Sequence, residues 1–205
     1  LRKKPKKISE RTVLVTGFGP FGQHAVNASW EAVKELYERR DELRERHGIN
    51  LIIDNIPVAY DHVTNKIPQL WKEHDPMIVL HVGVRHDAAC LMIEDRAHAT
   101  GYFRQDINDK CPTEECANSS AHVIETGIDV EQLCREINDK NIEGGCRACV
   151  SHDAGRYLCE YIFYQSLCIQ PERTLFVHVP DIRVYTSQVT ANGLYDIIEC
   201  LAKGS

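Results

Sequence analysis

The chain has 205 residues, 43% of them hydrophobic and 26% charged, and its 24 Lys and Arg against 30 Asp and Glu give a net charge of −6. This composition is typical of one globular domain and excludes a disordered chain or a fibrous repeat. A chain of this length buries about 70% of the surface of its unfolded form, so folding requires neither disulfide bonds nor a structural metal.

Charge and hydropathy exclude further classes of protein. The first eleven residues carry six basic side chains and one acidic, which leaves 18 basic and 29 acidic side chains in the other 194 residues. An acidic body argues against nucleic acid as the main partner. The longest strongly apolar stretch, residues 77–84, is far shorter than the ~18 residues of a membrane span, so no membrane partner is expected. The charged N-terminal residues lack a hydrophobic signal region, which argues against secretion.

Cysteine usage bears on the compartment. The chain has nine cysteines, an odd number without the tight, even spacing of a secreted mini-domain. This indicates free thiols in a reducing compartment, so a cytosolic (cytoplasmic) location is expected. Most of them are expected to be small buried hydrophobic side chains. They are Cys90, Cys111, Cys116, Cys134, Cys146, Cys149, Cys159, Cys168 and Cys200.

Residues 1–11 are basic and unpatterned and are expected to form a flexible leader. After them, in chain order, hydrophobic periodicity predicts a strand at 12–16, a helix at 29–46, a strand at 49–56, a helix at 61–72 and a strand at 77–82. Then come a short apolar run at 90–93, a helix at 129–137, an extended segment at 147–151, a helix at 156–168, a strand at 174–179 and a closing helix at 187–202.

Strands that alternate with helices predict right-handed crossovers and a mainly parallel, mixed sheet with helices on both faces. The predicted fold class is therefore a three-layer α/β/α sandwich, and residues 12–205 are expected to form a single domain. The polar segment 103–128 has no regular period and is predicted to be a long loop or flap over the rim of the sheet.

A glycine-rich loop, residues 17–22 (GFGPFG), follows the first strand and satisfies the G-x-G-x-x-G pattern of dinucleotide-binding folds. Pro20 removes one amide donor, the next helix starts only near Ser29, and the first acid at a strand end, Asp54, lies too far along the chain. These departures argue against a dinucleotide cofactor, and none is expected.

Two aromatic side chains and an amide distinguish this loop. Phe18 and Phe21 stand at the carboxyl end of the strand, where ligands of open α/β sheets bind, and two rings there can sandwich a flat apolar or amide-like group. The alternative is that both rings pack in the core. Asn27 is expected to cap the following helix, and its amide can also hydrogen-bond the loop or a ligand.

A polar turn at residues 151–158 leads into the apolar helix that contains Cys159. If this helix begins after Gly155, Cys159 lies in its first turn, where unpaired amides and the helix dipole lower a thiol pKa, and the position suits a nucleophile. If Asp153 caps the helix instead, Cys159 lies one turn further in and is merely buried. The sequence leaves both alternatives open.

A nucleophilic thiol needs a base, and two histidines qualify by position. His178 lies near the carboxyl end of a predicted strand, and His81 lies near the end of another, and their spacing does not separate them. Either can also be an ordinary core residue. Glu94 follows the apolar run 90–93 and can orient an imidazole and stabilise its charged form, or it is an ordinary surface acid.

A C-x-x-C pair, Cys146 and Cys149, together with Cys111 and Cys116 invites a structural zinc site. The alternative is a redox pair, but such a pair normally starts a helix. The zinc site is disfavoured because Cys149 opens a predicted buried strand and is expected to face the core. No metal site is expected.

Five segments in this order and spacing resemble the pyroglutamyl-peptidase I family, also called pyrrolidone carboxyl peptidase. They are 13–22 (VLVTGFGPFG), 27–30 (NASW), 81–84 (HVGV), 153–159 (DAGRYLC) and 176–180 (FVHVP). The resemblance extends over about residues 12–180, and TGFGPFG and AGRYLC are its most specific parts.

The resemblance implies a catalytic set. The family's nucleophile falls on Cys159, its histidine on His178, in preference to His81, and its carboxylate on Glu94. The form is closest to the animal type, because the chain has Gln23 where the commoner bacterial pattern has a second glycine.

The resemblance also implies a substrate site. Phe18 and Phe21 fall on the aromatics that hold the pyroglutamyl ring, and Asn27 on the loop asparagine. Arg104 corresponds in spacing to an arginine near the active site of bacterial members, although the residues just before it match poorly. Residues 105–145 barely resemble the family.

The function that the resemblance implies is a cysteine exopeptidase, acting without a cofactor on peptides with an N-terminal pyroglutamate through a thioester intermediate. Residues 12–205 are then one catalytic domain with a phosphorylase/hydrolase-like fold. Two alternatives stay open: an altered or inactive relative that binds pyroglutamyl peptides, and a nucleoside-phosphorylase-like transferase of small ligands. The presence of all three catalytic residue types argues against an inactive relative.

Overall fold

The computed structural model describes residues 11–22, 25–112 and 121–204. The expected leader therefore lies outside the described residues, except for Arg11, which opens the first strand. The strands, in chain order, are β1 (Arg11–Phe18), β2 (Ile49–Ile56), β3 (Ile78–Val84), β4 (Leu91–Glu94), β5 (Arg96–His98), β6 (Val123–Glu125), β7 (Ala148–Ser151) and β8 (Thr174–Val179). The helices are α1 (Ala28–Glu38), α2 (Arg40–His47), α3 (Tyr60–His74), α4 (Val130–Lys140), α5 (Leu158–Leu167) and α6 (Ser187–Lys203), with a short 3₁₀ turn η1 (Pro171–Arg173).

Six of the strands form one central sheet in the order β2-β1-β3-β8-β4-β7. All neighbours are parallel except β4 and β8, which run antiparallel. The runs VLVTGF of β1, IVLHVG of β3 and TLFVHV of β8 are buried throughout, as strands covered on both faces must be. The predicted mainly parallel, mixed sheet is confirmed.

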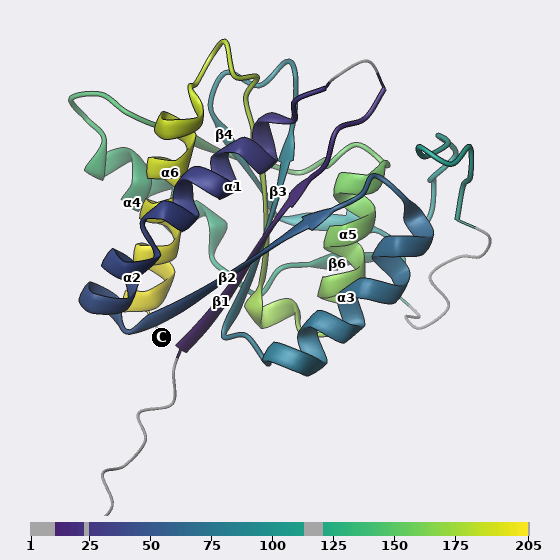
Figure 1. Cartoon of the computed structure of the whole chain (residues 1–205), viewed down its shortest axis with the longest axis horizontal. Helices are drawn as coiled ribbons and strands as arrows, with labels where there is room; N and C mark the ends of the chain where they lie inside the picture. The colour runs from purple at the N-terminus through teal and green to yellow at the C-terminus, as the bar shows by residue number, and fades with distance from the viewer. Residues whose placement is uncertain (1–10, 23–24, 113–120, 205) are drawn as a thin grey trace, which may run out of the picture.

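Helices cover the sheet on both sides (Figure 1). On one side α1, α2, α4 and α6 enclose a core that includes Leu36, Leu43, Ile137 and Leu194. On the other side α3 and α5 enclose a second core, which includes Ile67, Trp71 and Phe163. The three-layer α/β/α sandwich predicted from the alternation of strands and helices is therefore confirmed.

One predicted helix is two helices. The pattern over 29–46 continues through Arg39, but α1 ends at Glu38 and α2 begins at Arg40. At the break, the Arg39 guanidinium lies 3.7 Å from the centroid of the Tyr195 ring on α6 and pairs with Glu42. The contact with Tyr195 involves a helix that is distant in the chain, so local periodicity does not contain it.

The segment 103–128 is not a loop throughout. It contributes β6, which pairs antiparallel with β5 in a separate two-stranded sheet next to α5. The prediction missed both strands because each has only three residues, too few to show a period. The described remainder of the segment is irregular, in keeping with a flap.

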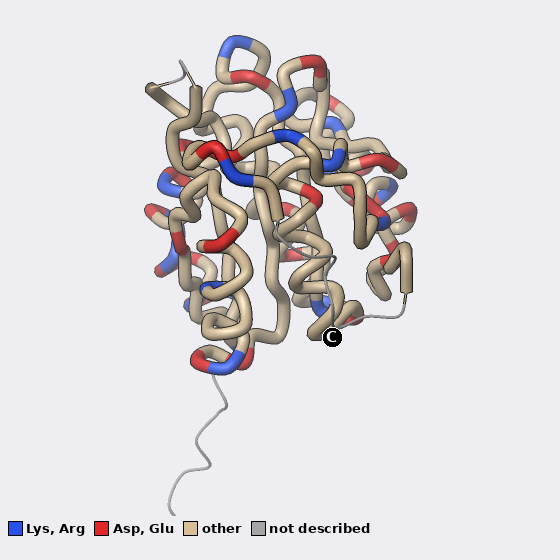
Figure 2. Tube along the Cα trace, turned by 90° about the vertical axis from the view of Figure 1, so that its right-hand side faces the viewer, with Lys and Arg blue, Asp and Glu red and all other residues tan. Residues whose placement is uncertain are grey.

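Charge is distributed as in an ordinary globular surface. In the view of Figure 2, Lys and Arg are intermingled with Asp and Glu along the described trace, without a continuous basic stripe. No helix in the described part of the chain is both long and apolar enough to span a bilayer.

Candidate active site

A cavity of about 370 Å³ opens at the rim of the sheet where β1, β3 and β8 end. Its walls come from the loop after β1, the ends of β3 and β8, the segment around Arg104 and the start of α5. The lining residues are Phe18, Phe21, Asn27, Val58, Val84, Arg85, His86, Arg104, Ala154, Tyr157, Leu158, Cys159 and His178. Six of the seven predicted site residues are among them. The seventh, Glu94, does not line the cavity but is hydrogen-bonded to His178.

Cys159 is the second residue of α5, because Tyr157 is the N-cap and Leu158 the first helical residue. The alternative in which the helix begins after Gly155 is therefore confirmed. Tyr157 makes no side-chain cap, so the amides at the start of the helix keep their hydrogen-bonding capacity next to the cavity.

The thiol pKa is not lowered as the helix position suggests. The pKa of Cys159 is raised to about 12, mainly by burial and also by the negative charge of Glu94, while Arg104 acts in the opposite direction. Desolvation of a thiolate in this pocket outweighs the helix dipole, whose effect is limited to the first turn. Cys159 therefore rests as a neutral thiol and needs a base to become a nucleophile.

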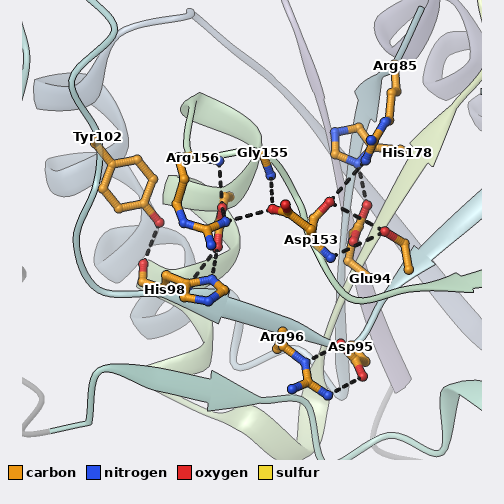
Figure 3. Close-up of polar contacts among 12 residues, drawn as sticks. Arg85, Glu94, Asp95, Arg96, His98, Tyr102, Asp153, Gly155, Arg156 and His178 are labelled. Atoms are coloured by element: carbon orange, nitrogen blue, oxygen red, sulfur yellow. Dashed lines mark hydrogen bonds and ion pairs between the residues drawn. The ribbon is translucent and has the colours of Figure 1, made fainter. Parts of the chain in front are cut away.

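His178 is the base candidate that the cavity contains. Its Nδ1 lies 2.7 Å from Oε1 of Glu94, so this nitrogen donates its proton to the carboxylate (Figure 3). Nε2 is thereby left as the nitrogen that accepts a proton. The pair is held in the sheet, His178 on β8 and Glu94 on the adjoining strand β4.

Glu94 lies below the rim of the sheet, although it is the last residue of its strand. Because β4 runs antiparallel to β8, Glu94 pairs in register with Phe176 and sits two positions below His178. Its side chain is 0% exposed, and Oε2 has no hydrogen-bond partner among the described residues. The alternative of an ordinary surface acid is therefore wrong.

Gly83 is a site residue that the sequence analysis missed. It pairs in register with His178, and a Cβ at this position would lie 2.5 Å from Sγ of Cys159. The glycine therefore makes room for the thiol beside the histidine. A glycine inside an otherwise apolar strand signals such a close approach, and the HVGV segment contained that signal.

His81, the other histidine at the rim, is a core residue. Thr16 Oγ1 lies 2.6 Å from its Nδ1 and Ser166 Oγ lies 2.7 Å from its Nε2, so both nitrogens are used. Complete burial lowers its pKa to about 3, which keeps the ring neutral. It does not line the cavity.

The loop after β1 supplies the aromatic wall. Phe18 is buried, Phe21 is half-buried, and both line the cavity. Asn27 caps α1 as expected, since its Oδ1 accepts from the Ser29 amide at 3.0 Å, and its Nδ2 donates to the Gly19 carbonyl at 3.1 Å. The Asn27 amide therefore fixes the loop that carries the two rings.

Arg104 reaches the cavity from the irregular segment after β5. Its side chain is exposed, and its guanidinium lies 4.2 Å from the centroid of the Tyr157 ring. The arginine and the tyrosine form one side of the entrance. Arg85, which the sequence analysis left without a role, also lines the cavity and donates to the Asp153 carbonyl at 3.0 Å.

The structure separates the C-x-x-C pair. Cys146 is buried and its thiol contacts the Val189 carbonyl, whereas Cys149 is exposed and its Sγ lies 3.1 Å from Sγ of Cys90. The expectation that Cys149 faces the core is wrong, because β7 is the edge strand of the sheet. Cys116 lies outside the described residues, and among those described no three His, Cys, Asp or Glu side chains are grouped to hold a metal.

Comparison with known proteins agrees with the motifs. The sequence profile of the family described as pyroglutamyl peptidase matches residues 11–195. Pyroglutamyl-peptidase 1 of Rattus norvegicus is 38% identical over 191 residues, which are 92% of this chain and 88% of the rat protein. Pyrrolidone-carboxylate peptidase of Bacillus licheniformis is 29% identical over 178 residues, 83% of this chain and 78% of its own length.

Solved structures share the fold. Pyroglutamyl peptidase I of Bacillus amyloliquefaciens superposes with a TM-score of 0.80 at 23% identity and covers 95% of this chain and 98% of its own. A mutant pyrrolidone carboxyl peptidase of Pyrococcus furiosus has a TM-score of 0.82 at 21% identity and covers 94% and 99%. With a profile match over most of its length and a 38% identical relative, this chain belongs to the pyroglutamyl peptidase family.

Proposed function

We propose that this protein is a cysteine exopeptidase that hydrolyses the N-terminal pyroglutamyl residue from peptides. The observation that carries the proposal is the buried hydrogen bond from His178 to Glu94, at 2.7 Å, beneath a cavity whose wall includes Cys159. Family membership supplies the substrate class.

In this mechanism the thiol of Cys159 is the nucleophile. His178 takes the thiol proton through Nε2 as Sγ attacks the pyroglutamyl carbonyl, which avoids a free thiolate in a site that disfavours one. When the tetrahedral intermediate collapses, His178 returns the proton to the departing amine and a thioester remains. Water, deprotonated by the same nitrogen, then hydrolyses the thioester and releases pyroglutamate.

Glu94 acts on His178 and not on the substrate. Its carboxylate keeps the proton on Nδ1, fixes the ring plane and offsets the positive charge that the imidazole acquires in both steps. The full burial of Glu94 strengthens this effect, because water does not screen the pair.

The oxyanion of the tetrahedral intermediate must be stabilised by hydrogen-bond donors, and the start of α5 supplies them. The uncapped amides of that first turn and the positive end of the helix dipole face the cavity. Arg104 stands close enough to lower the pKa of Cys159, so its charge also reaches the reacting atoms. It is a second stabilising group.

The aromatic wall fits the substrate. A pyroglutamyl ring is a flat, neutral lactam, so it requires stacking surfaces and amide hydrogen bonds but no acid for an α-ammonium group. Phe18 and Phe21 supply apolar surfaces at the cavity, and Asn27 holds their loop in place. A site that pairs the lactam polar groups rejects prolyl peptides, which would leave those groups unpaired.

Residues 12–205 act in this proposal as one catalytic domain in the cytosol. All eight cysteines that the structure describes are free thiols, which fits a reducing compartment. The substrates are peptides and proteins with an N-terminal pyroglutamate. No metal or cofactor takes part in the steps above.

The test is turnover of a pyroglutamyl fluorogenic amide by the native chain, Cys159→Ala and a control, Cys200→Ala, on α6. We expect turnover by the native chain and the control, and none by Cys159→Ala. A folded native chain that binds the substrate without turnover is instead a binding protein. Turnover by Cys159→Ala, or turnover that depends on phosphate, contradicts the thiol mechanism.

A further inference from the structure

Glu160, the residue after the candidate nucleophile, is a fully buried carboxylate for which the mechanism has no use. Each of its oxygens accepts two hydrogen bonds. Oε1 accepts from the backbone amide and the ring Nδ1 of His98, at 2.8 and 2.6 Å. Oε2 accepts from the backbone amide and Nη1 of Arg156, at 2.6 and 2.8 Å.

The turn before α5 is the segment that these bonds hold. Gly155 has a φ of 97° and Arg156 a φ of 55°, and a non-glycine residue at positive φ costs about 1–2 kcal/mol. Such a conformation persists only where the surroundings enforce it. The Arg156 amide donates to Glu160, and the Gly155 amide donates to Asp153 Oδ1 at 3.0 Å.

The hydrogen bond that the Glu160 carboxylate accepts from the Arg156 amide resembles a capping-box bond shifted by one residue toward the N-terminus. Glu160 is the third residue of α5, the position whose side chain in a capping box reaches back to the N-cap amide. Here it reaches past the N-cap, Tyr157, to Arg156. The amides of the helix start are thereby left to the cavity, while the turn in front of them is fixed.

Glu160 also ties this turn to the two-stranded sheet of β5 and β6. His98 belongs to β5, and its carbonyl accepts from the Tyr102 hydroxyl (Figure 3). A Cβ added at Gly101 would lie 3.4 Å from Cδ of Arg156, so this glycine packs against the arginine side chain. The carboxylate is therefore the point at which β5, the turn and the nucleophile helix meet.

We propose that Glu160 is a positioning residue of the active site: its buried carboxylate fixes the turn 153–157, and with it the amides at the start of α5 that stabilise the oxyanion. This inference rests on the proposed function. It assigns Glu160 no contact with substrate, because its oxygens are all committed to His98 and Arg156.

Glu160→Gln is the discriminating variant. All four partners donate to the carboxylate, so the NH2 group of a glutamine must face one pair of them: it loses both bonds if it faces Arg156, and at least the bond from the backbone amide if it faces His98. We expect a folded protein with kcat lower by about 10–100-fold and KM within about threefold, since small displacements of catalytic groups act on the transition state. Glu125→Gln, at the exposed end of β6, removes one carboxylate charge from the small sheet that contains His98 and is expected to keep native kcat.

Hydrogen–deuterium exchange of the peptide covering residues 153–160 gives a readout that does not require activity. We expect much faster exchange in Glu160→Gln than in the native chain or Glu125→Gln. Native kcat in Glu160→Gln, or unchanged exchange of the turn, overturns the positioning role. A native chain without turnover contradicts the proposed function instead, and the exchange measurement alone then decides whether Glu160 holds the turn.

A second, independent observation concerns the thiol pair Cys90 and Cys149. Cys90 immediately precedes β4, Cys149 lies on the edge strand β7, and their sulfur atoms are 3.1 Å apart. A disulfide requires about 2.05 Å, so an approach of about 1 Å closes it. We propose that this pair is an oxidation site that forms an intramolecular disulfide with hydrogen peroxide.

The chemistry balances with peroxide as the two-electron oxidant. Burial is the main cause that raises the pKa of Cys90 to about 12, so the exposed Cys149 meets peroxide first. Its sulfur gains an oxygen and one water leaves. Cys90 then attacks that sulfur, its proton leaves with the hydroxyl group as a second water, and the S–S bond forms.

Peptide mapping of the peroxide-treated Cys159→Ala protein tests this without interference from the nucleophile. We expect one linked pair of peptides that contain Cys90 and Cys149 and lack two hydrogens. The link should be absent from a Cys90→Ser variant in the same background and should disappear on reduction. Recovery of the two cysteines as separate alkylated or overoxidised peptides overturns the proposal.

Discussion

At the scale of single residues, Gly83 shows how closely the site is packed. A methyl group there would lie 2.5 Å from Sγ of Cys159 and 2.8 Å from Cζ of Phe176, both below any real contact distance. We expect Gly83→Ala to lower kcat/KM by at least about 100-fold, because the thiol must move, and to cost about 1–3 kcal/mol of unfolding free energy. Substrate turnover and urea unfolding measure the two effects.

The control for Gly83→Ala is Gly204→Ala, just beyond α6. There the nearest atom to an added Cβ is 4.0 Å away and φ is −85°. This variant should match the native chain in both measurements. Native turnover by Gly83→Ala would contradict the geometry that sets Cys159 against β3.

The reactivity of Cys159 is a second prediction at this scale. Because burial and Glu94 raise its pKa to about 12, the fraction of thiolate keeps growing with pH well above 9. The rate of alkylation by iodoacetamide should therefore rise up to the highest pH at which the protein stays folded. A plateau below pH 8 would mean that the thiol rests as a thiolate. Mass spectrometry of the Cys159 peptide follows the reaction.

At the scale of elements, Asn27 joins a helix to a loop. Its Oδ1 caps α1 and its Nδ2 holds the Gly19 carbonyl, so one amide fixes both the helix start and the loop with Phe18 and Phe21. Asn27→Ala should cost about 1–2 kcal/mol of unfolding free energy through the lost cap. It should also raise KM, because the loop loses its anchor.

Asn27→Asp separates these two effects. A carboxylate still accepts from the Ser29 amide and suits a helix N-terminus, but it cannot donate to Gly19. The carboxylate oxygen that replaces Nδ2 faces the Gly19 carbonyl oxygen in a buried site, so some stability should be lost despite the retained cap, and KM should rise at least as much as in Asn27→Ala. Equal KM in the native chain and Asn27→Asp would show that the loop needs no donor at this position.

Most of these elements could be predicted because local pattern determines them. The strands at β2 and β8 were predicted with their observed bounds, Ile49–Ile56 and Thr174–Val179, since β-branched runs that end at glycine, proline or polar turns are unambiguous. The candidate catalytic residues were found because each stands next to such a boundary. The close approach of Gly83 to Cys159 could not be predicted in this way, because it depends on where α5 packs against the sheet.

What the sequence did not reveal is non-local. The reversal of β4 relative to β8, which buries Glu94, depends on how strands far apart in the chain are paired. The contact of Arg39 with Tyr195 at the break between α1 and α2 joins residues far apart in the chain, and the exposure of Cys149 depends on β7 being an edge strand. The pKa of Cys159 likewise follows from the pocket around it and not from its place in a helix.

At the scale of the whole molecule, a buried polar chain crosses from the sheet to one helical layer. It runs from Thr16 on β1 through His81 on β3 to Ser166 on α5, whose hydroxyl also accepts from the indole of Trp71 on α3 at 3.0 Å. All its polar atoms are paired, so it stabilises one arrangement of these layers. This chain of hydrogen bonds is sensitive to acid, because burial disfavours the protonated, charged form of His81.

The final prediction follows from the pKa of His81, which burial lowers to about 3 from its ordinary value of 6.5. Between these two pH values the unfolded chain binds a proton that the folded chain excludes. The contribution of neutral His81 to the free energy of unfolding is therefore fully present above pH 6.5, and it falls toward pH 3 by up to about 1.4 kcal/mol per pH unit. Urea unfolding from pH 7.5 to 5 should show this loss in the native chain and in His62→Gln, an exposed control. His81→Gln, which cannot take up the proton, should show a flatter dependence even if it is less stable at pH 7.5. Equal slopes in all three proteins would assign the acid sensitivity to other groups.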